Sequence, residues 1–306
     1  MLVGPTAIGK TDLSLILSRR YDCEIVSVDS MQVYRHMDIG TAKASLAERR
    51  EVPHHLIDIV DPDENYDAAR FAADGLQAIG DIHSRGKIPL LTGGTGLYLQ
   101  ALFEGIFPGV AVDENTRRIL QQRLVADGAS KLHEELRACD RISAERIHVN
   151  DSQRLLRALE VFHVSGVPWS KHIAAHQQQT PGVLFKNALQ IGLTTDRTHL
   201  YQRIDKRCAM MLEYGLEEEV QKLLDMGYDP NLKPFGSIGY RHIINYREGR
   251  WTRDEAIRLL ARDTRRYAKR QYTWFSKLTA LQWFDVAEKE KILQIVGDWF
   301  ATQSLI

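Results

Sequence analysis

The sequence predicts an α/β fold in which a parallel sheet is flanked by helices and interrupted by an all-helical insertion. Three observations support this prediction. A glycine-rich loop near the N-terminus lies between a short apolar segment and a helix-forming segment. Apolar runs rich in β-branched residues recur after it, as expected for parallel strands buried on both faces. Residues 113–180 break this alternation, because they have the pattern of helices almost throughout.

The composition is that of a globular protein without membrane segments. Hydrophobic residues make up 44% of the chain and charged residues 26%, and no apolar run approaches the roughly 20 residues that cross a bilayer. No export signal opens the chain. The three cysteines lie far apart, which argues against a disulfide framework and a cysteine-rich zinc site. We therefore expect a cytoplasmic protein, and with a net charge of zero any RNA-binding charge must be concentrated on one face.

Residues Gly4–Thr11, with the sequence GPTAIGKT, fit the P-loop pattern. Its glycines let several backbone N–H groups converge on one anion, and the helix that follows presents its positive end to the same anion. In this pattern Lys10 reaches the terminal phosphate and the Thr11 hydroxyl holds Mg²⁺. The motif predicts a P-loop NTPase-like core that binds a phosphate chain, without indicating which compound carries it. Only Met1–Val3 precede the loop, so we expect a truncated first strand.

Two further predicted strands end on polar or glycine-rich segments. Residues 24–28 lead to Asp29, and residues 88–92 lead to the glycine-rich turn at 93–96. A later strand is expected at 189–193. Ligands bind at the carboxyl ends of such strands, so Asp29 should face the same crevice as the P-loop. Two roles remain open for Asp29 at this point, a magnesium carboxylate or a general base.

Three segments together resemble the bacterial tRNA dimethylallyltransferases, also called tRNA isopentenyltransferases. They are the P-loop, the segment DSMQVY at 29–34 and the segment GGTGLY at 93–98. Further matching segments lie at 38–43, 53–58, 151–157, 201–207, 239–241 and 269–275, so the resemblance covers nearly the whole chain. The departures are Ile8, where the family usually has a small serine, Ser276, where a basic residue is common, and the truncated strand before the P-loop.

The resemblance implies a monomeric enzyme that uses Mg²⁺ to transfer a dimethylallyl group from dimethylallyl diphosphate to tRNA. The acceptor is the exocyclic amine of the adenosine 3′-adjacent to the anticodon. Asp29 is then the general base, and Thr95 bonds near the reacting centre and the leaving oxygen. The resemblance places the diphosphate on Gly4, Thr6, Ala7, Gly9, Lys10, Thr11 and Arg203. Arg197 and Arg207 lie in the same stretch as Arg203, and Arg207 is the alternative to it.

The family also implies a surface for the anticodon stem-loop of tRNA. The target base must leave its stack, and Gln32 suits an adenine edge because an amide both donates and accepts. The implied tRNA-binding residues are Ser30, Met31, Gln32, Arg117, Gln153, Arg154, Arg157, Gly239, Tyr240, Arg241, Lys269, Arg270 and Trp274. By contrast, we interpret the adjacent His54 and His55 as structural.

We expect a catalytic core formed by residues 1–112 and 181–306 and an insertion domain at 113–180. Helices are predicted at 114–126 and 131–138, and another begins at Asn150 or Asp151 and stops at Gly166. Near the C-terminus, the capping box at 252–255 opens a long helix. From residue 253 to 277 there are eight Lys and Arg against three Asp and Glu, with aromatic residues among them. Such a surface suits phosphates and unpaired bases, although Phe275 fits core packing equally well.

Three other functions fit parts of this pattern. The P-loop alone also suits a kinase of small molecules or nucleosides that uses ATP, and the catalytic segments suit a prenyltransferase acting on free adenine nucleotides. The helical insertion and the basic C-terminal helix argue against both. A catalytically silent RNA-binding protein is disfavoured because Lys10, Thr11, Asp29 and Thr95 are all present.

Overall fold

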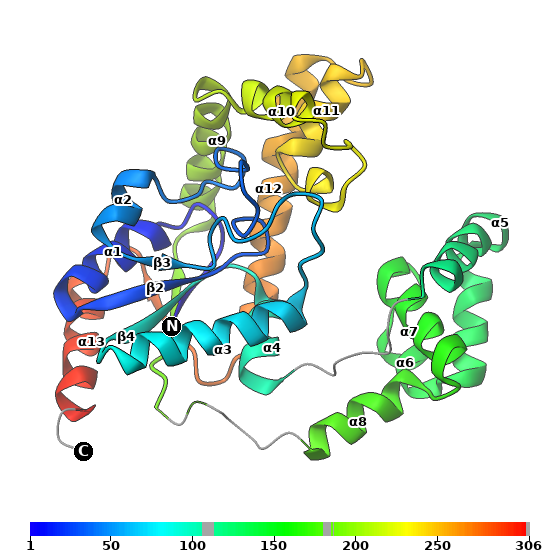
Figure 1. Cartoon of the computed structure of the whole chain (residues 1–306), viewed down its shortest axis with the longest axis horizontal. Coiled ribbons are helices and arrows are strands. Elements are labelled where there is room, and N and C mark those ends of the chain that lie inside the picture. The colour runs from blue at the N-terminus through cyan, green and yellow to red at the C-terminus, as the bar shows by residue number, and fades with distance from the viewer. Residues whose placement is uncertain (106–112, 180–184, 186, 304–306) are drawn as a thin grey trace. The chain divides into compact units, whose positions relative to one another are not determined.

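The computed structural model describes residues 1–105, 113–179, 185 and 187–303 (Figure 1). It divides into two compact units, one made of Met1–Leu102 with Phe185–Ile306 and the other of Phe103–Leu184. Residues 112, 180 and 181, where we expected the catalytic core to give way to the insertion and to resume, lie outside the described ranges. Among the described residues, no helix combines the length and apolar character that spanning a membrane requires.

The larger unit is built on a six-stranded sheet in which every pair of strands is parallel, as predicted. The strand order is β3-β2-β4-β1-β5-β6. The strands are β1 Leu2–Val3, β2 Cys23–Val28, β3 His54–His55, β4 Ile88–Gly93, β5 Ile191–Thr194 and β6 Gln282–Asp285. The short β1 pairs with β4 on one side and β5 on the other. The P-loop therefore leaves the middle of the sheet at its carboxyl edge.

Helices cover both faces of this sheet. The described helices of the larger unit are α1 Lys10–Tyr21, α2 Leu46–Glu51, α3 Ala68–Ser84, α4 Gly96–Glu104, α9 Arg197–Glu213, α10 Leu216–Asp225, α11 Tyr240–Arg247, α12 Arg253–Phe275 and α13 Lys289–Gln303, with a 3₁₀ turn at Lys233–Gly236. Right-handed crossovers place α1 and α3 on opposite faces, because β1 to β2 and β3 to β4 run in opposite directions across the sheet. Helix α13 packs beside α1, where the ring of Tyr21 stacks on Phe300 at 4.6 Å.

Helices α9 to α12 rise beyond the carboxyl edge of the sheet (Figure 1). Helix α12 begins where the sequence predicts, since the Thr252 side chain accepts a hydrogen bond from the Glu255 N–H at 3.2 Å. It packs along α9. Phe275 is fully buried, so the core interpretation is confirmed for this residue. One face of α12 is therefore fixed in the core close to the P-loop.

In the smaller unit, the described residues 113–179 form four helices, α5 Glu114–Cys139, α6 Arg141–Arg146, α7 Ser152–Ser165 and α8 Trp169–Gln179. Gly128 has a φ of 82° and divides α5 into two helical segments, which agrees with the two helices predicted there. Asp151 caps α7 by accepting from the Arg154 N–H, and Gly166 ends it in the left-handed conformation, as predicted. Leucines from α5 and α7 form the core of this unit.

Candidate active site

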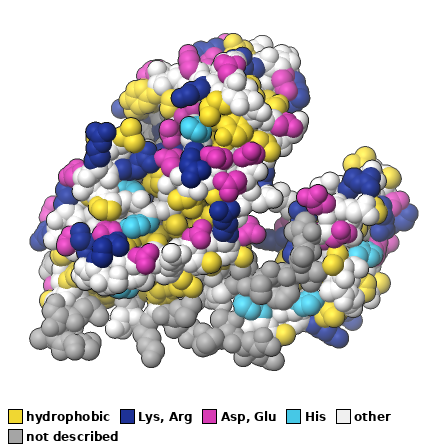
Figure 2. Space-filling view, in the orientation of Figure 1, with side chains coloured by type: hydrophobic (Ala, Val, Ile, Leu, Met, Phe, Trp, Pro, Cys, Tyr) yellow, Lys and Arg dark blue, Asp and Glu magenta, His cyan; other side chains and the backbone are white. Residues whose placement is uncertain are grey.

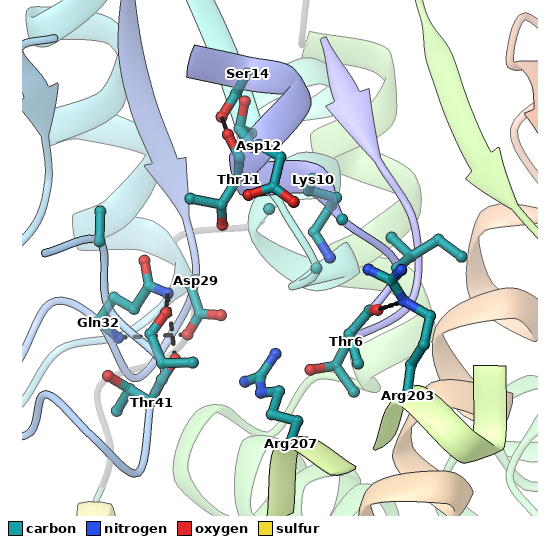
Figure 3. A pocket seen from close by; sticks show the side chains of 18 of the residues that line it. Thr6, Lys10, Thr11, Asp12, Ser14, Asp29, Gln32, Thr41, Arg203 and Arg207 are labelled. Atoms are coloured by element: carbon teal, nitrogen blue, oxygen red, sulfur yellow. Dashed lines mark hydrogen bonds between the residues drawn. The ribbon is translucent and has the colours of Figure 1, made fainter. Parts of the chain in front are cut away.

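The P-loop, the end of β2 and helix α9 surround a cavity of about 850 Å³, called here the P-loop cavity. It lies at the carboxyl edge of the sheet, where the predicted strands bring their polar ends together. Figure 3 shows Lys10, Asp29 and Arg207 turned toward the same space. Its lining includes most of the residues predicted for the diphosphate and the general base: Thr6, Ala7, Gly9, Lys10, Thr11, Asp29 and Arg203.

The P-loop holds its lysine in a defined position. The Lys10 ammonium donates to the carbonyl oxygens of Gly4 at 3.0 Å and Pro5 at 2.9 Å, so the side chain folds back along the loop. Burial lowers the Lys10 pKa to about 7, with a further lowering by the nearby Arg207 and an opposing effect of Asp29. An anion in the cavity would stabilise the charged form of this lysine. Ile8 is buried beneath the loop and leaves Lys10 and Thr11 on the cavity wall.

Two arginines of α9 lie on the wall of the P-loop cavity. Arg203 donates through Nε to the carbonyl oxygen of Ala7 at 2.8 Å, which fastens α9 to the P-loop. Arg207 lies one turn further along α9, and burial lowers its pKa. Arg197 lines a separate small cavity, with its guanidinium 5.1 Å from the ring centre of Tyr201. Of the three candidate arginines, Arg203 and Arg207 therefore face the P-loop.

Asp29 is held by the turn that follows β2. Its Oδ1 accepts hydrogen bonds from the N–H groups of Met31 at 2.8 Å and Gln32 at 3.3 Å, and neither bond uses Oδ2. Thr95 lies beside the same turn, where its hydroxyl oxygen accepts from the Ser30 N–H at 3.0 Å. The loop after β4 thus holds the turn that orients the carboxylate.

A second cavity of about 300 Å³ adjoins the first and is called here the adjoining cavity. Ser30, Met31, Arg241 and Arg270 line it, together with apolar side chains from α9 and α12 such as Met211. The two cavities have five lining residues in common, which are Thr6, Asp29, Thr41, Arg207 and Tyr267. Asp29 is therefore accessible from two sides.

Gln271 is a site residue that the sequence interpretation missed. Its side-chain oxygen accepts from the Thr6 N–H at 2.8 Å, and its amide nitrogen donates to the Gly94 carbonyl at 3.0 Å. A Cβ on Gly94 would lie 2.2 Å from that nitrogen, so a larger residue there would displace the Gln271 amide. The available signal was a polar residue on the apolar face of α12, four residues before the buried Phe275. Gln271 joins α12 to the P-loop and to the loop after β4.

The Gln32 amide, which we expected to meet an adenine edge, has protein partners at both of its ends. Its side-chain oxygen accepts from the Ser27 hydroxyl at 2.9 Å. Its amide nitrogen donates to the carbonyl oxygens of Thr41 at 3.3 Å and Ala42 at 3.4 Å. Because both ends of the amide already have protein partners, Gln32 fixes the neighbouring loop.

The expectation that Tyr240 contacts tRNA is wrong, because its side chain is fully buried. Its hydroxyl donates to Glu219 at 2.6 Å. Gly239, with a φ of 101°, only starts α11. Arg241 does line the adjoining cavity, and its guanidinium donates to Asp263 at 2.6 Å. Of this predicted trio, Arg241 is the one that lines a cavity wall.

The predicted residues of α12 separate onto two faces. Arg270 lines the adjoining cavity, whereas Lys269 lines the small cavity that contains Arg197. Trp274 is partly buried and packs edge-on against Phe275, with ring centres 5.4 Å apart. Neighbouring basic residues of this helix therefore serve different surfaces.

In the helical unit, two of the arginines predicted to contact tRNA share one buried carboxylate as their partner. Arg117 and Arg157 both pair with the buried carboxylate of Glu160, at 3.0 and 3.1 Å. Their guanidinium groups thus offset a charge that would otherwise be costly to bury. Gln153 and Arg154 are exposed, and Arg154 pairs with Asp151 at 3.1 Å. Of the four residues predicted to contact tRNA in this unit, Gln153 and Arg154 are therefore the more accessible to an RNA ligand.

The histidine pair forms β3. His55 contacts the buried Glu24 carboxylate at 2.7 Å, in agreement with a structural role. His54 bonds to the Val52 carbonyl at 2.7 Å, and burial lowers its pKa. His54 also lines the P-loop cavity, which the sequence did not indicate.

Comparisons with known proteins show similarity to one family over nearly the whole chain. Residues 32–278 match the family model described as IPP transferase, and residues 1–58 match isopentenyl transferase. A tRNA dimethylallyltransferase of Desulfotalea psychrophila is 55% identical over 303 residues, covering 99% of this chain and 96% of that protein. A tRNA dimethylallyltransferase 2 of Geotalea uraniireducens is 48% identical and covers 94% and 92%.

Two solved structures are also similar. The tRNA isopentenylpyrophosphate transferase of Bacillus halodurans superposes with a TM-score of 0.71 at 39% identity, covering 99% of this chain and 96% of that one. A eukaryotic dimethylallyltransferase acting on tRNA superposes with a TM-score of 0.81 at 28% identity, covering 98% and 79%.

Proposed function

The chain belongs to the tRNA dimethylallyltransferase family, and we propose that it transfers the prenyl group of dimethylallyl diphosphate to the exocyclic amine of the adenosine 3′-adjacent to the anticodon. One observation carries the proposal at the level of the site. The P-loop cavity and the adjoining cavity meet at Asp29 and Arg207. A phosphorylated donor and a nucleobase can therefore approach the same carboxylate from different sides.

The P-loop cavity is the site that we assign to the donor. Its diphosphate would lie on the P-loop N–H groups and on the cations of Lys10, Arg203 and Arg207, which line this cavity. These groups face the position at which negative charge grows as the bond between carbon and oxygen breaks. Fixed cations and N–H groups stabilise such charge without reorganising during the reaction.

The residues around Thr11 fit a magnesium ion. Thr11 lies in the first turn of α1, and its side chain lines the P-loop cavity together with the carboxylates of Asp12 and Asp29. Mg²⁺ prefers such oxygen ligands and is commonly shared with substrate phosphates. When bound, the ion would neutralise charge on the leaving diphosphate.

The adjoining cavity is the site that we assign to the acceptor adenosine, flipped out of its stack. The amine is a weak nucleophile because its lone pair is delocalised into the ring. Asp29 would accept the amine proton as the new nitrogen–carbon bond forms, while the carbon–oxygen bond breaks and diphosphate leaves. Ser30 and Met31 line the wall on which the base would rest, with Arg241 and Arg270 near its phosphates.

A direct assay separates this function from the alternatives. The protein is incubated with Mg²⁺, labelled dimethylallyl diphosphate and unmodified tRNA, with AMP as the acceptor in a second arm and ATP with nucleosides in a third. We expect label in tRNA only, at the adenosine beside the anticodon. Label in AMP would identify a prenyltransferase of free nucleotides, and ATP consumption without prenyl transfer would identify a kinase.

A further inference from the structure

A carboxylate outside both cavities organises the loop that lies between them. Glu219, on α10, accepts the backbone N–H groups of Asp38 at 2.9 Å and Ile39 at 2.7 Å on one oxygen. Its other oxygen accepts the Gly40 N–H at 3.1 Å and the Tyr240 hydroxyl at 2.6 Å. Three successive N–H groups and a buried phenol thus converge on a single side chain.

The packing around this loop admits little variation. A Cβ on Gly40 would lie 2.4 Å from the ring of Tyr240, so the loop approaches that ring as closely as glycine allows. The next residue, Thr41, donates its hydroxyl to the Met37 carbonyl at 2.7 Å. The loop therefore has a fixed shape, and Glu219 and Tyr240 hold it from the side of α10 and α11.

This loop is connected to the catalytic carboxylate by hydrogen bonds. The carbonyl oxygens of Thr41 and Ala42 accept from the Gln32 amide, and the Gln32 N–H donates to Asp29. Gly40 and Thr41 line the adjoining cavity, and Thr41 also lines the P-loop cavity. A displacement of residues 38–40 would therefore move both the wall of the acceptor site and the support of Asp29.

We infer that Glu219 is a positioning residue, which sets the acceptor side of the reaction centre through residues 38–42 and Gln32. The inference rests on the proposed function. It assigns Glu219 no contact with either substrate. The phosphate-binding side is held independently, by Arg203 and Gln271 on the P-loop. Loss of the Glu219 carboxylate should accordingly affect the use of tRNA much more than the use of the donor.

The decisive variant is Glu219→Gln, which keeps the volume of the side chain. The amide nitrogen then replaces one of the two oxygens, so it cannot accept the two hydrogen bonds that this oxygen receives in the wild type. Hydrogen bonds to a charged group are among the stronger ones, and we expect kcat/KM for tRNA to fall about 10- to 100-fold. The KM for dimethylallyl diphosphate and the binding of pyrophosphate, measured by calorimetry, should stay within about twofold. The control is Glu218→Gln, which removes one negative charge at the exposed preceding position of α10 and should behave as wild type.

Tyr240→Phe provides a second test that holds even if Glu219→Gln fails to fold. It removes one of the four hydrogen bonds and leaves the carboxylate, so we expect a smaller loss of kcat/KM for tRNA, about threefold to tenfold. A Tyr240→Phe enzyme with unchanged tRNA kinetics, or a Glu219→Gln enzyme that loses pyrophosphate binding as much as tRNA use, would overturn the inference. A wild-type enzyme that labels no tRNA would instead overturn the proposed function.

Discussion

At the scale of single residues, the orientation of Asp29 comes from its own turn. Two consecutive N–H groups occupy one carboxylate oxygen, and this leaves the other available to a ligand. Burial lowers the pKa values of Lys10 and Arg207, and the negative charge of Asp29 opposes this lowering. One carboxylate and two basic side chains thus line the same cavity.

The first prediction concerns Asp29→Asn. The amide oxygen can still accept the Met31 and Gln32 N–H groups, so the turn should survive, but the side chain no longer accepts a proton. We expect kcat to fall by about 10²- to 10⁴-fold, the usual contribution of a general base. Binding of tRNA, measured by fluorescence anisotropy, should stay within about twofold. A variant that turns over at the wild-type rate would exclude Asp29 as the base.

The second prediction concerns the charge of Lys10. Its pKa of about 7 in the free protein means that the amine is neutral above that pH, whereas a bound diphosphate favours the charged form and raises the pKa. Binding at pH 8 should therefore take up a proton. Relative to a variant whose cation at this position does not titrate, the affinity should decline as the pH rises above 7. Pyrophosphate titrations by calorimetry, in buffers of different ionisation enthalpy, measure this uptake.

The matched control is Lys10→Arg, whose guanidinium stays charged throughout this range. The uptake seen with the wild type should exceed that of Lys10→Arg by a substantial fraction of one proton. Equal uptake in the two proteins would show that Lys10 is already charged before the ligand binds.

At the scale of elements, helix starts and stops were predictable because their chemistry is local. Asp151, Gly166 and Thr252 each act on backbone groups within a few residues. Strands β2, β4 and β5 were predictable for a similar reason, since each is a short apolar run, whereas β3, of two histidines, and β6, with the sequence QWFD, were not predicted. The same holds for the position of Asp29, which follows directly from the end of β2.

Contacts between distant segments were not predictable from the sequence. Gln271 meets Thr6 across 265 positions of the chain, and Glu219 meets Asp38 across 181. Nothing in the sequence around either residue indicates its partner. Tyr240 was misassigned for this reason, because the resemblance of residues 239–241 to the family does not show that the tyrosine is buried against Glu219.

The third prediction concerns the junction of helices α6 and α8. Asp140 is buried and accepts four hydrogen bonds from the N–H and hydroxyl groups of Ser143 and Ser170, at 2.6 to 3.0 Å. These bonds outweigh the effect of burial and hold the Asp140 pKa below its usual value. Asp140→Ala leaves the partners unsatisfied, so we expect a loss of about 2–4 kcal/mol in the stability of the helical unit.

Hydrogen exchange localises this effect. Amides of α6 and α8 should exchange faster in Asp140→Ala, whereas those of the sheet should be unchanged. Glu145→Ala is the control, because its exposed pair with Arg141 should contribute less than about 0.5 kcal/mol. Uniform acceleration over the whole chain would show that the two units do not unfold separately.

At the scale of the whole molecule, overall charge does not favour RNA binding. The chain carries 40 basic and 40 acidic residues, and Figure 2 shows the two kinds mixed over the face in view. Affinity for tRNA therefore has to come from local placement of cations. On α12, two consecutive basic residues lie on different faces of the helix. Arg270 lines the adjoining cavity, whereas Lys269 lines the small cavity together with Arg197.

The last prediction uses this separation to identify which face of α12 meets the RNA. A cation that contacts phosphate contributes to the salt dependence of binding, so its loss should reduce the slope of log K against log salt by about one. We expect this reduction in both Arg270→Ala and Lys269→Ala. Arg270→Ala should also lower the rate at saturating tRNA, because it lines the cavity that contains Asp29. Lys277→Ala, an exposed residue just beyond α12, is the control. An unchanged slope in Lys269→Ala would mean that the RNA lies only on the face of α12 that carries Arg270.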